Sequence, residues 1–327
     1  MLRYFLLWLL WFTDSHKYTL FKLVMFDMER TVHKGIKILF RLLGLIPEKW
    51  RRIIADFLGR VVFLTDRRHR RIVMDNLTHA FGHEKNRFEI RILAKRVFIN
   101  LVLIIFEIGW SLSLDEKQFR KYFKIDGKSN IKRAYEKNKG VLALTAHFGN
   151  FELLTVIAAM INYPLSIVVR PLSFKPLDRF FVDLRTRFGG KIIPKQRSFR
   201  AILRSLERKE MVALLMDQNV DWYEGVFVDF MGRLACTNSG LALLALKTRT
   251  PVVPVVLIRE KTGFRAEFGP EIPLIETGDK RKDVELNTLQ YNRIIETIVR
   301  RYPEQWFWVH QRWKTKPYHP WPRIADK

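Results

Sequence analysis

A histidine and a carboxylate lie five positions apart in the segment His147-Phe148-Gly149-Asn150-Phe151-Glu152. Residues five apart do not share a helix face, so the two side chains can meet only across a turn, which Gly149 and Asn150 favour. A carboxylate on one imidazole nitrogen would fix the tautomer and leave the other nitrogen free to take a proton from a hydroxyl. The spacing therefore permits general-base catalysis by His147 and Glu152. It equally permits a capped helix start with a histidine nearby.

The elements on either side would place this segment at the edge of a sheet. The apolar run 141–146 predicts a buried strand, and residues 152–161 predict an apolar helix. From about residue 120 onward, short apolar strands alternate with helices, which is typical of an α/β domain with a largely parallel sheet. We expect a layered sheet with helices on both faces.

Two more predicted strands end in polar residues. Arg170 follows the strand 165–169, and Asp217 and Asn219 follow the strand 211–216. The carboxyl ends of parallel strands meet at one edge of such a sheet. We therefore expect His147, Arg170 and Asp217 to converge there. For Asp217 and Asn219, the alternative is a turn that only caps the next segment.

The charge of the chain points to anionic partners. Its 327 residues carry 58 Lys and Arg against 33 Asp and Glu, a formal net charge of +25. Such a protein would attract nucleic acid, an anionic membrane face, or acidic substrates and carriers. We find no helix-turn-helix, zinc-finger or RNP-like motif, so a nucleic-acid partner is not expected. The lone Cys236 rules out an intramolecular disulfide, and no metal site or cofactor is expected.

The N-terminal region, residues 1–50, is apolar and basic. Its apolar stretches 2–12 and 36–46 are shorter than the roughly 20 residues of a perpendicular membrane span. Basic clusters at 51–52 and 67–71 follow them, as in segments that lie near anionic lipid. We predict a membrane-anchoring helical region that is not cleaved, with a buried N-terminal helix as the alternative. A single domain at 51–327 would follow, helical over 51–116 and α/β over 120–327.

Several segments together resemble a known family. The His-x4-Glu segment is similar to the signature of membrane glycerolipid acyltransferases, and its Gly-Asn form is closest to the bacterial lipid A late acyltransferases. The resemblance runs from about Ile38 to Lys314 and includes the segments 168–171, 183–189, 217–219, 251–255 and 303–313. One difference is Gln311, where the family more often has arginine. Another is the extended N-terminus, residues 1–30.

The resemblance implies the transfer of an acyl chain from a thioester to a lipid hydroxyl. The donor would be acyl carrier protein or coenzyme A, and the acceptor an anionic lipid A precursor. The protein would lie at the cytoplasmic face of the bacterial inner membrane. His147 would act as general base, oriented by Glu152, with no acyl-enzyme, because no Gly-x-Ser-x-Gly elbow is present.

The remaining site residues would bind substrate or stabilise the oxyanion. The backbone around Gly149 and Asn150, and Arg170, are candidates for the oxyanion. Arg185 and Arg187 would bind acceptor phosphates or sugar acids, although an exposed basic helix face is the alternative for both. The resemblance also favours a site role for Asp217.

Three other readings stay open at this stage. The same chemistry could act on another membrane lipid, such as a lysophospholipid or a glycolipid mannoside. The charge alone would fit a nucleic-acid-binding protein. The fold could also serve as an inactive peripheral scaffold, in which the pair of His147 and Glu152 would be dispensable.

Overall fold

The computed structural model describes residues 27–196 and 198–317. Within them, seven strands form one sheet in the order β1-β9-β8-β2-β5-β3-β4. The strands are β1 (Phe123–Asp126), β2 (Val141–Thr145), β3 (Leu165–Val169), β4 (Lys191–Pro194), β5 (Met211–Leu215), β8 (Val252–Arg259) and β9 (Phe264–Phe268). All neighbours pair in parallel except β8 and β9, which form an antiparallel hairpin. A separate antiparallel pair, β6 (Gly225–Phe230) and β7 (Arg233–Asn238), lies outside this sheet.

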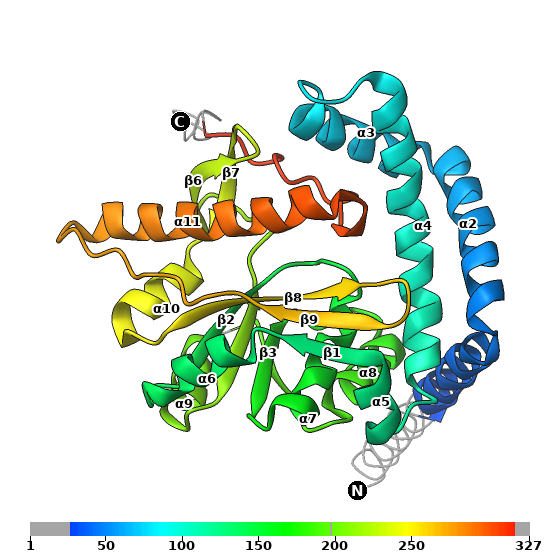
Figure 1. Cartoon of the computed structure of the whole chain (residues 1–327), viewed down its shortest axis with the longest axis horizontal. Helices are drawn as coiled ribbons and strands as arrows, with labels where there is room; N and C mark the ends of the chain where they lie inside the picture. Colours follow the sequence, from blue (N-terminus) through cyan, green and yellow to red (C-terminus); the bar gives the residue numbers. More distant parts are fainter. Residues whose placement is uncertain (1–26, 197, 318–327) are drawn as a thin grey trace, which may run out of the picture.

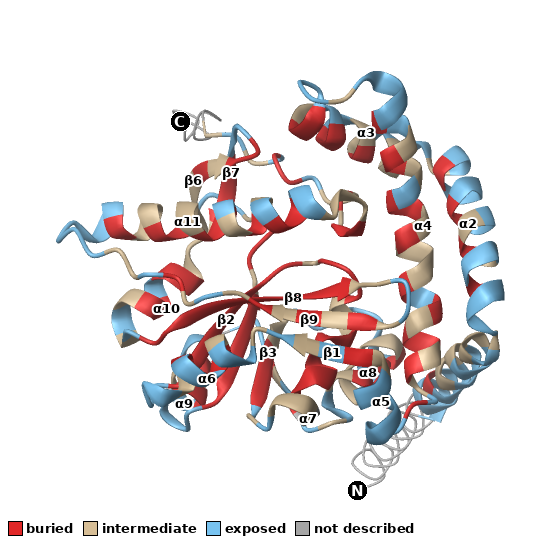
Figure 2. Ribbon diagram, in the orientation of Figure 1, coloured by how far each residue is buried: buried red, intermediate tan, exposed pale blue. Residues whose placement is uncertain are grey.

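Helices cover both faces of the sheet (Figure 1). They are α2 (Glu48–Thr65), α3 (Arg67–Phe81), α4 (Arg87–Ser111), α5 (Glu116–Tyr122), α6 (Lys128–Glu136), η1 (Phe151–Ile157), α7 (Ala158–Ile161), α8 (Lys175–Thr186), α9 (Ser198–Glu207), α10 (Gly240–Thr248), α11 (Lys280–Arg301) and η2 (Pro303–Gln305). The central strand β2 is buried throughout, as Figure 2 shows for the middle of the sheet. Its side chains alternate: Leu142 and Leu144 join the core under α9, α10 and α11, and Val141 and Ala143 join the core under α6, η1 and α8.

The long helix α4 stands across the carboxyl edge of the sheet (Figure 1). Its first half packs in the core that includes α11, and its second half packs in the core that includes η1 and α8. On its outer side α2 packs closely, since a β-carbon at Gly59 would lie 2.6 Å from the Ile99 Cα atom. The carboxyl edge, where chemistry is expected, is therefore walled by a helix pair.

Residues 27–45 are helical and pack on the α/β layers. Phe40 stacks on Phe180 of α8 with ring centroids 4.5 Å apart, and His33 and Lys37 both pair with Asp183. The outward side chains, including Ile38, remain exposed. The predicted apolar stretch 2–12 lies outside the described residues. Among the residues described, no helix has both the length and the apolar character needed to cross a membrane.

The expected fold class is confirmed: the sheet is mostly parallel and has helices on both faces. The helix expected over 152–161 is present, but its first part is not an α-helix. Residues 151–157 form the 3-10 helix η1, and only the four residues of α7 are α-helical. The short strand β1 and the pair β6 and β7 were not predicted.

Candidate active site

His147 and Asp217 meet at the carboxyl edge of the sheet. The His147 Nδ1 atom lies 2.9 Å from Asp217 Oδ1, and the His147 backbone N–H donates to Asp217 Oδ2 at 3.0 Å. The carboxylate is 1% exposed, whereas the imidazole is 21% exposed. A hydrogen bond on Nδ1 fixes the tautomer whose Nε2 atom can accept a proton. His147 is thus oriented by a buried carboxylate and remains accessible to a substrate.

Strand register explains why these two residues meet. Strands β2 and β5 are parallel neighbours, and their last paired residues are Thr145 and Leu215. His147 and Asp217 each lie two positions beyond that pair. The expected convergence of these strand ends is therefore confirmed. The two positions are 70 apart in the sequence, and the chain between them forms β3, β4 and their connecting helices before it returns beside β2 as β5.

The segment after α11 completes the carboxylate's environment. Trp306 Nε1 donates to Asp217 Oδ2 at 2.8 Å, and the Phe307 backbone N–H donates to the His147 carbonyl at 3.1 Å. Phe148 and Trp306 form an isolated antiparallel bridge. The Phe151 ring meets the imidazole edge-on, with centroids 4.8 Å apart. Apolar rings therefore flank the histidine, and Asp217 accepts three hydrogen bonds.

The hydrogen bonds keep Asp217 ionised despite its burial. Burial opposes ionisation, but the electrostatic interaction with His147 and the hydrogen bonds from His147 and Trp306 outweigh it, so the pKa of Asp217 lies below its ordinary value. A second histidine lies close by. Burial lowers the pKa of His310 to about 4, against the opposing attraction of Asp217. Neutral His310 accepts from the Asn219 N–H at 2.6 Å through its Nε2 atom. At neutral pH, His310 is therefore uncharged, and His147 is the histidine that the Asp217 carboxylate contacts.

Gly149 makes the turn that carries His147. Its φ is +57°, and a β-carbon there would lie 1.9 Å from the Leu257 carbonyl oxygen of β8. Only glycine fits this close approach. The Gly149 N–H donates to the Gln305 carbonyl at 2.9 Å. That donor is engaged within the fold, so it is not available for the oxyanion role expected of it.

Glu152 is not bonded to His147 in the structure. Arg185 holds it instead, with Nε to Oε2 at 2.9 Å and Nη2 to Oε1 at 3.0 Å. Both side chains are nearly buried. A bidentate pair of this kind fixes the planes of the carboxylate and the guanidinium, and it links η1 to α8. Asp217, and not Glu152 as expected, is therefore the carboxylate that contacts His147. The 3-10 turn directs Glu152 toward Arg185 of α8 instead.

Two other expected binding residues hold the fold together. Arg187 donates to the carbonyls of Ser111 at 2.8 Å and Leu114 at 2.6 Å, where α4 ends. Burial lowers its pKa. The Asn219 amide exchanges hydrogen bonds with Thr315, at 2.9 and 3.1 Å. Both side chains are thus engaged within the fold, although Arg187 is an exposed residue.

Asn150 and Arg170 have opposite environments. Asn150 is fully buried, and its Nδ2 donates to the Ile104 carbonyl and to Glu107, at 3.2 and 3.1 Å. It makes no side-chain cap for η1, contrary to expectation. Arg170 is exposed just beyond β3, two strands from β2. No ion pair or hydrogen bond of its side chain is found within the described ranges, so it is the predicted cation still open to a ligand.

The comparison with known families decides the class of the protein. Residues 27–315 match the family model of the bacterial lipid A biosynthesis acyltransferases. The chain belongs to this family. It is therefore an acyltransferase, as the resemblance implied, and its family acts in lipid A biosynthesis.

Curated members of the family are distant relatives of this acyltransferase. The lipid A biosynthesis palmitoleoyltransferase of Escherichia coli (strain K12) is 26% identical over 255 residues, which cover 77% of this chain and 80% of the relative. A lipid A biosynthesis acyltransferase of Haemophilus influenzae is 24% identical over 84% of this chain and 85% of its own length. The lauroyltransferase of E. coli is 23% identical, covering 80% and 84%.

Sequence reasoning missed Trp306 and His310, two residues of the C-terminal segment that shape the acyltransferase site. Arg312 of the same segment, together with Trp313, is a residue that the sequence interpretation expects to close the site. Arg312 is fully buried and donates to the Cys236 carbonyl at 2.9 Å and to the Thr237 hydroxyl. Burial lowers its pKa to about 10. Over residues 27–196 and 198–317, no cluster of three or more His, Cys, Asp or Glu could hold a metal ion.

Proposed function

We propose that this acyltransferase moves a fatty acyl chain from a thioester to a hydroxyl of a lipid A precursor, with His147 as general base. Acyl carrier protein is the expected donor, with coenzyme A as the alternative. The observation that carries the proposal is the accessible imidazole of His147, whose Nδ1 lies 2.9 Å from the buried Asp217 carboxylate. This arrangement resembles the base and orienting acid of a catalytic triad without the protein nucleophile.

The chemistry follows from this pair. His147 Nε2 takes the proton of the acceptor hydroxyl while its oxygen attacks the thioester carbonyl carbon. The tetrahedral intermediate collapses, the carbon–sulfur bond breaks, and the imidazolium returns the proton to the departing thiolate. Asp217 stabilises the imidazolium between these steps. The acyl group passes directly to the acceptor oxygen, so no acyl-enzyme forms.

Glu152 has a different proposed role in this scheme. Its bidentate pair with Arg185 fixes η1, and Phe151 of η1 packs on the imidazole. Glu152 is therefore a positioning residue, which acts through the segment that frames His147. Arg170, exposed at the same sheet edge, is the proposed cation for a negatively charged part of the substrate or for the oxyanion.

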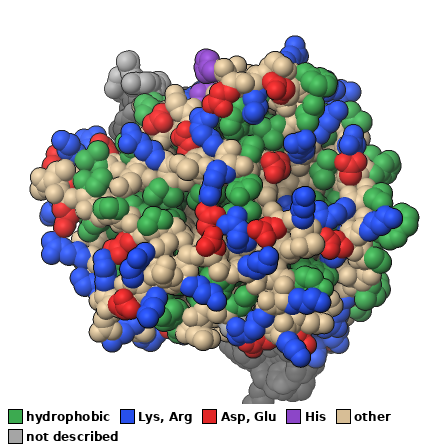
Figure 3. Space-filling model, viewed as in Figure 1, with side chains coloured by type: hydrophobic (Ala, Val, Ile, Leu, Met, Phe, Trp, Pro, Cys, Tyr) green, Lys and Arg blue, Asp and Glu red, His purple; other side chains and the backbone are tan. Residues whose placement is uncertain are grey.

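The surface charge supports anionic substrates. Figure 3 shows Lys and Arg side chains spread over the face seen in Figure 1, with acidic side chains among them. An excess of 25 positive charges raises the encounter rate with acidic carriers and with phosphorylated lipids. This agrees with acyl carrier protein as donor and a phosphorylated lipid as acceptor.

A membrane surface is the proposed location. The helix 27–45 and α2 expose large apolar side chains, among them Leu42 at 58%, Leu45 at 72%, Trp50 at 56% and Phe57 at 65%. Basic residues of both helices lie among these apolar ones. An apolar helix face with basic flanks favours the headgroup region of an anionic leaflet. We place this face on the cytoplasmic leaflet of the inner membrane.

The test uses the purified full chain in non-ionic detergent. We expect wild-type protein to acylate a Kdo-bearing lipid A precursor from acyl carrier protein thioester, and His147→Ala to lose that transfer. The exposed substitution Arg204→Gln on α9 serves as the control. Undiminished transfer by His147→Ala would remove the proposed base. Transfer by wild type to a lysophospholipid but not to the lipid A precursor would keep the chemistry and overturn the acceptor.

A further inference from the structure

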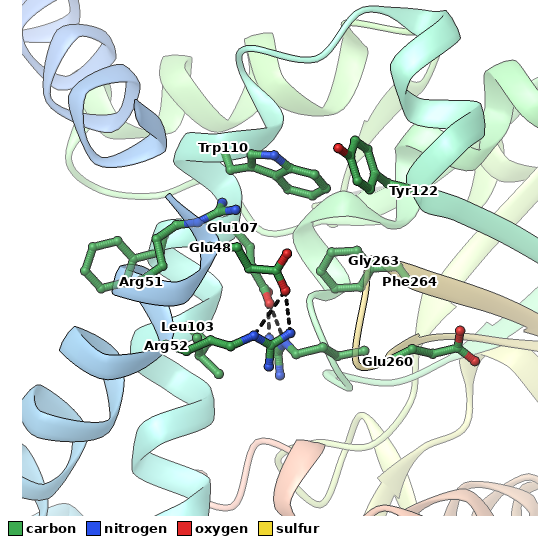
Figure 4. Close-up of a pocket in the computed structure, with 12 residues that line it drawn as sticks. Glu48, Arg51, Arg52, Leu103, Glu107, Trp110, Tyr122, Glu260, Gly263 and Phe264 are labelled. Carbon is green, nitrogen blue, oxygen red and sulfur yellow. Dashed lines mark hydrogen bonds and ion pairs between the residues drawn. The ribbon is translucent and has the colours of Figure 1, made fainter. Parts of the chain in front are cut away.

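A small pocket lined by charged and aromatic side chains lies between α2, α4 and the β8–β9 hairpin (Figure 4). Arg51, Glu107, Trp110, Tyr122, Arg259 and Phe264 are among its lining residues, and its volume is about 40 Å³. That volume holds a few water molecules or a small oxyanion. The pocket is separate from His147 and has no role in the proton transfers described above.

Arg51 is the unusual residue of this pocket. It is 8% exposed, and its Nε and Nη1 atoms are buried without a hydrogen-bond partner among residues 27–196 and 198–317. Burial lowers its pKa, although the nearby charges of Glu48 and Glu107 oppose that effect. Its guanidinium lies 5.2 Å from the centre of the Trp110 ring, and Figure 4 shows it directed toward that ring. A buried cation with unused donors is unfavourable unless an anion completes it.

The carboxylates around the pocket are already committed to other cations. Glu48 accepts from Arg52 at 3.1 and 2.8 Å, and Glu260 accepts from Arg265 at 2.8 Å. Glu107 forms an ion pair with Arg259. Figure 4 marks the Glu48 and Glu107 pairs by dashed lines. The lining holds three arginines and three glutamates, but none of these glutamates pairs with Arg51, so its guanidinium is the group that favours an anionic ligand.

The pocket wall is joined to the catalytic turn. Arg259 is the last residue of β8, the strand beside β2. Its partner Glu107 also accepts a hydrogen bond from Asn150, the residue that follows Gly149. The opposite wall is α2, whose exposed Trp50 and Ile53 belong to the proposed membrane face. A ligand held here would lie between the lipid surface and the reacting end of the sheet.

We propose that Arg51 binds a phosphate oxyanion in this pocket. Phosphate offers several acceptor oxygens to the unused guanidinium donors. Two substrates could carry the group: the lipid acceptor and the phosphopantetheine arm of the donor. The assignment to a substrate rests on the proposed function, whereas phosphate binding itself does not.

Thermal unfolding of the full chain tests the binding. We expect phosphate to raise the Tm of wild type by about 2 °C or more over chloride at equal ionic strength. Arg51→Gln should lose this rise, and Arg51→Lys should keep part of it, since it retains the charge but not the planar fork. The matched control Arg204→Gln should respond like wild type. No rise in wild type, or an equal rise in Arg51→Gln, would overturn the proposal.

Steady-state kinetics identifies the source of the phosphate. If the acceptor supplies it, Arg51→Gln should raise the KM for a phosphorylated lipid A precursor about tenfold with kcat little changed. A rise confined to the KM of the donor would assign the donor's phosphate instead. Unchanged KM values for both would overturn the assignment to a substrate. If wild type transfers no acyl chain, the proposed function fails, and the thermal measurement still decides whether the pocket binds phosphate.

Discussion

Replacing Asp217 with asparagine should separate the role of this carboxylate from that of Glu152. The Asp217 Oδ2 atom accepts from two N–H groups, those of His147 and of the Trp306 indole, and Oδ1 faces His147 Nδ1. An asparagine amide placed with nitrogen at the Oδ2 position would face both donors, losing two hydrogen bonds worth about 1–3 kcal/mol each. The amide should therefore turn the other way, with its nitrogen toward His147.

This orientation disables the base. The amide N–H then donates to Nδ1, which forces the imidazole proton onto Nε2, the atom that must accept the substrate proton. A wrong tautomer of this kind lowers kcat by about four orders of magnitude in a serine protease. We expect Asp217→Asn to lower kcat by about 10³- to 10⁴-fold, with KM changed far less. The fold should persist, because two of the three hydrogen bonds survive.

The assay is acyl transfer from acyl carrier protein thioester to the lipid A precursor, with Tm measured on the same preparations. Asp126→Asn, an exposed change at the end of β1, is the matched control and should keep wild-type kcat. If folded Asp217→Asn retains more than a tenth of the wild-type kcat, Asp217 does not orient the base. The proton-transfer scheme would then need another partner for His147.

The remaining predictions concern the turn, the second histidine and the buried ion pair. Gly149→Ala should lower Tm by several degrees and abolish transfer, because its β-carbon would overlap a backbone oxygen. Gly189 is also at positive φ but has no described atom within 4 Å of the position that a β-carbon would take, so Gly189→Ala should cost only about 1 kcal/mol of strain. Equal losses of Tm in the two variants would refute the steric argument. Because the pKa of His310 is lowered in the folded state, the unfolded state binds more protons between about pH 4 and 6.5. The free energy of unfolding of wild type should therefore rise with pH over that range. In urea unfolding at pH 5 and 7, His310→Gln should show a smaller rise. An unchanged rise in His310→Gln would count against a buried neutral His310. Glu152→Gln and Arg185→Gln should each cost about 3 kcal/mol, and the double variant less than their sum; additive losses would show that the two charges are uncoupled.

The fold class follows from local patterns that the sequence displays directly. A fully buried strand such as β2 reads as a continuous apolar run, and the repeated change from such runs to helical spacing predicts a parallel sheet. The short strand β1 and the hairpin of β6 and β7 were missed. Their residues carry mixed burial patterns, which give a weak periodic signal.

The proposed base, His147, could be predicted from the sequence, but its carboxylate partner could not. His147 stands out because it ends an apolar run and precedes Gly149. The nearest carboxylate along the chain is Glu152, so local spacing favours it. The partner that the structure gives is Asp217, which lies 70 positions away, and no local pattern encodes the β2–β5 register that aligns them.

The sequence by itself thus determined the strand ends, the histidine and the chemical class that its motifs resemble. The tertiary structure decided which charges pair. The 3-10 turn sends Glu152 to Arg185, and the sheet register brings Asp217 to His147. The packing of α2 on α4 buries Arg51 and leaves two of its nitrogen atoms without a hydrogen bond to any residue that the structure describes. Pairing of this kind depends on distances between remote segments. Those distances are fixed only when the layers pack, because each buried charge must then find its counter-charge among the groups that packing brings near.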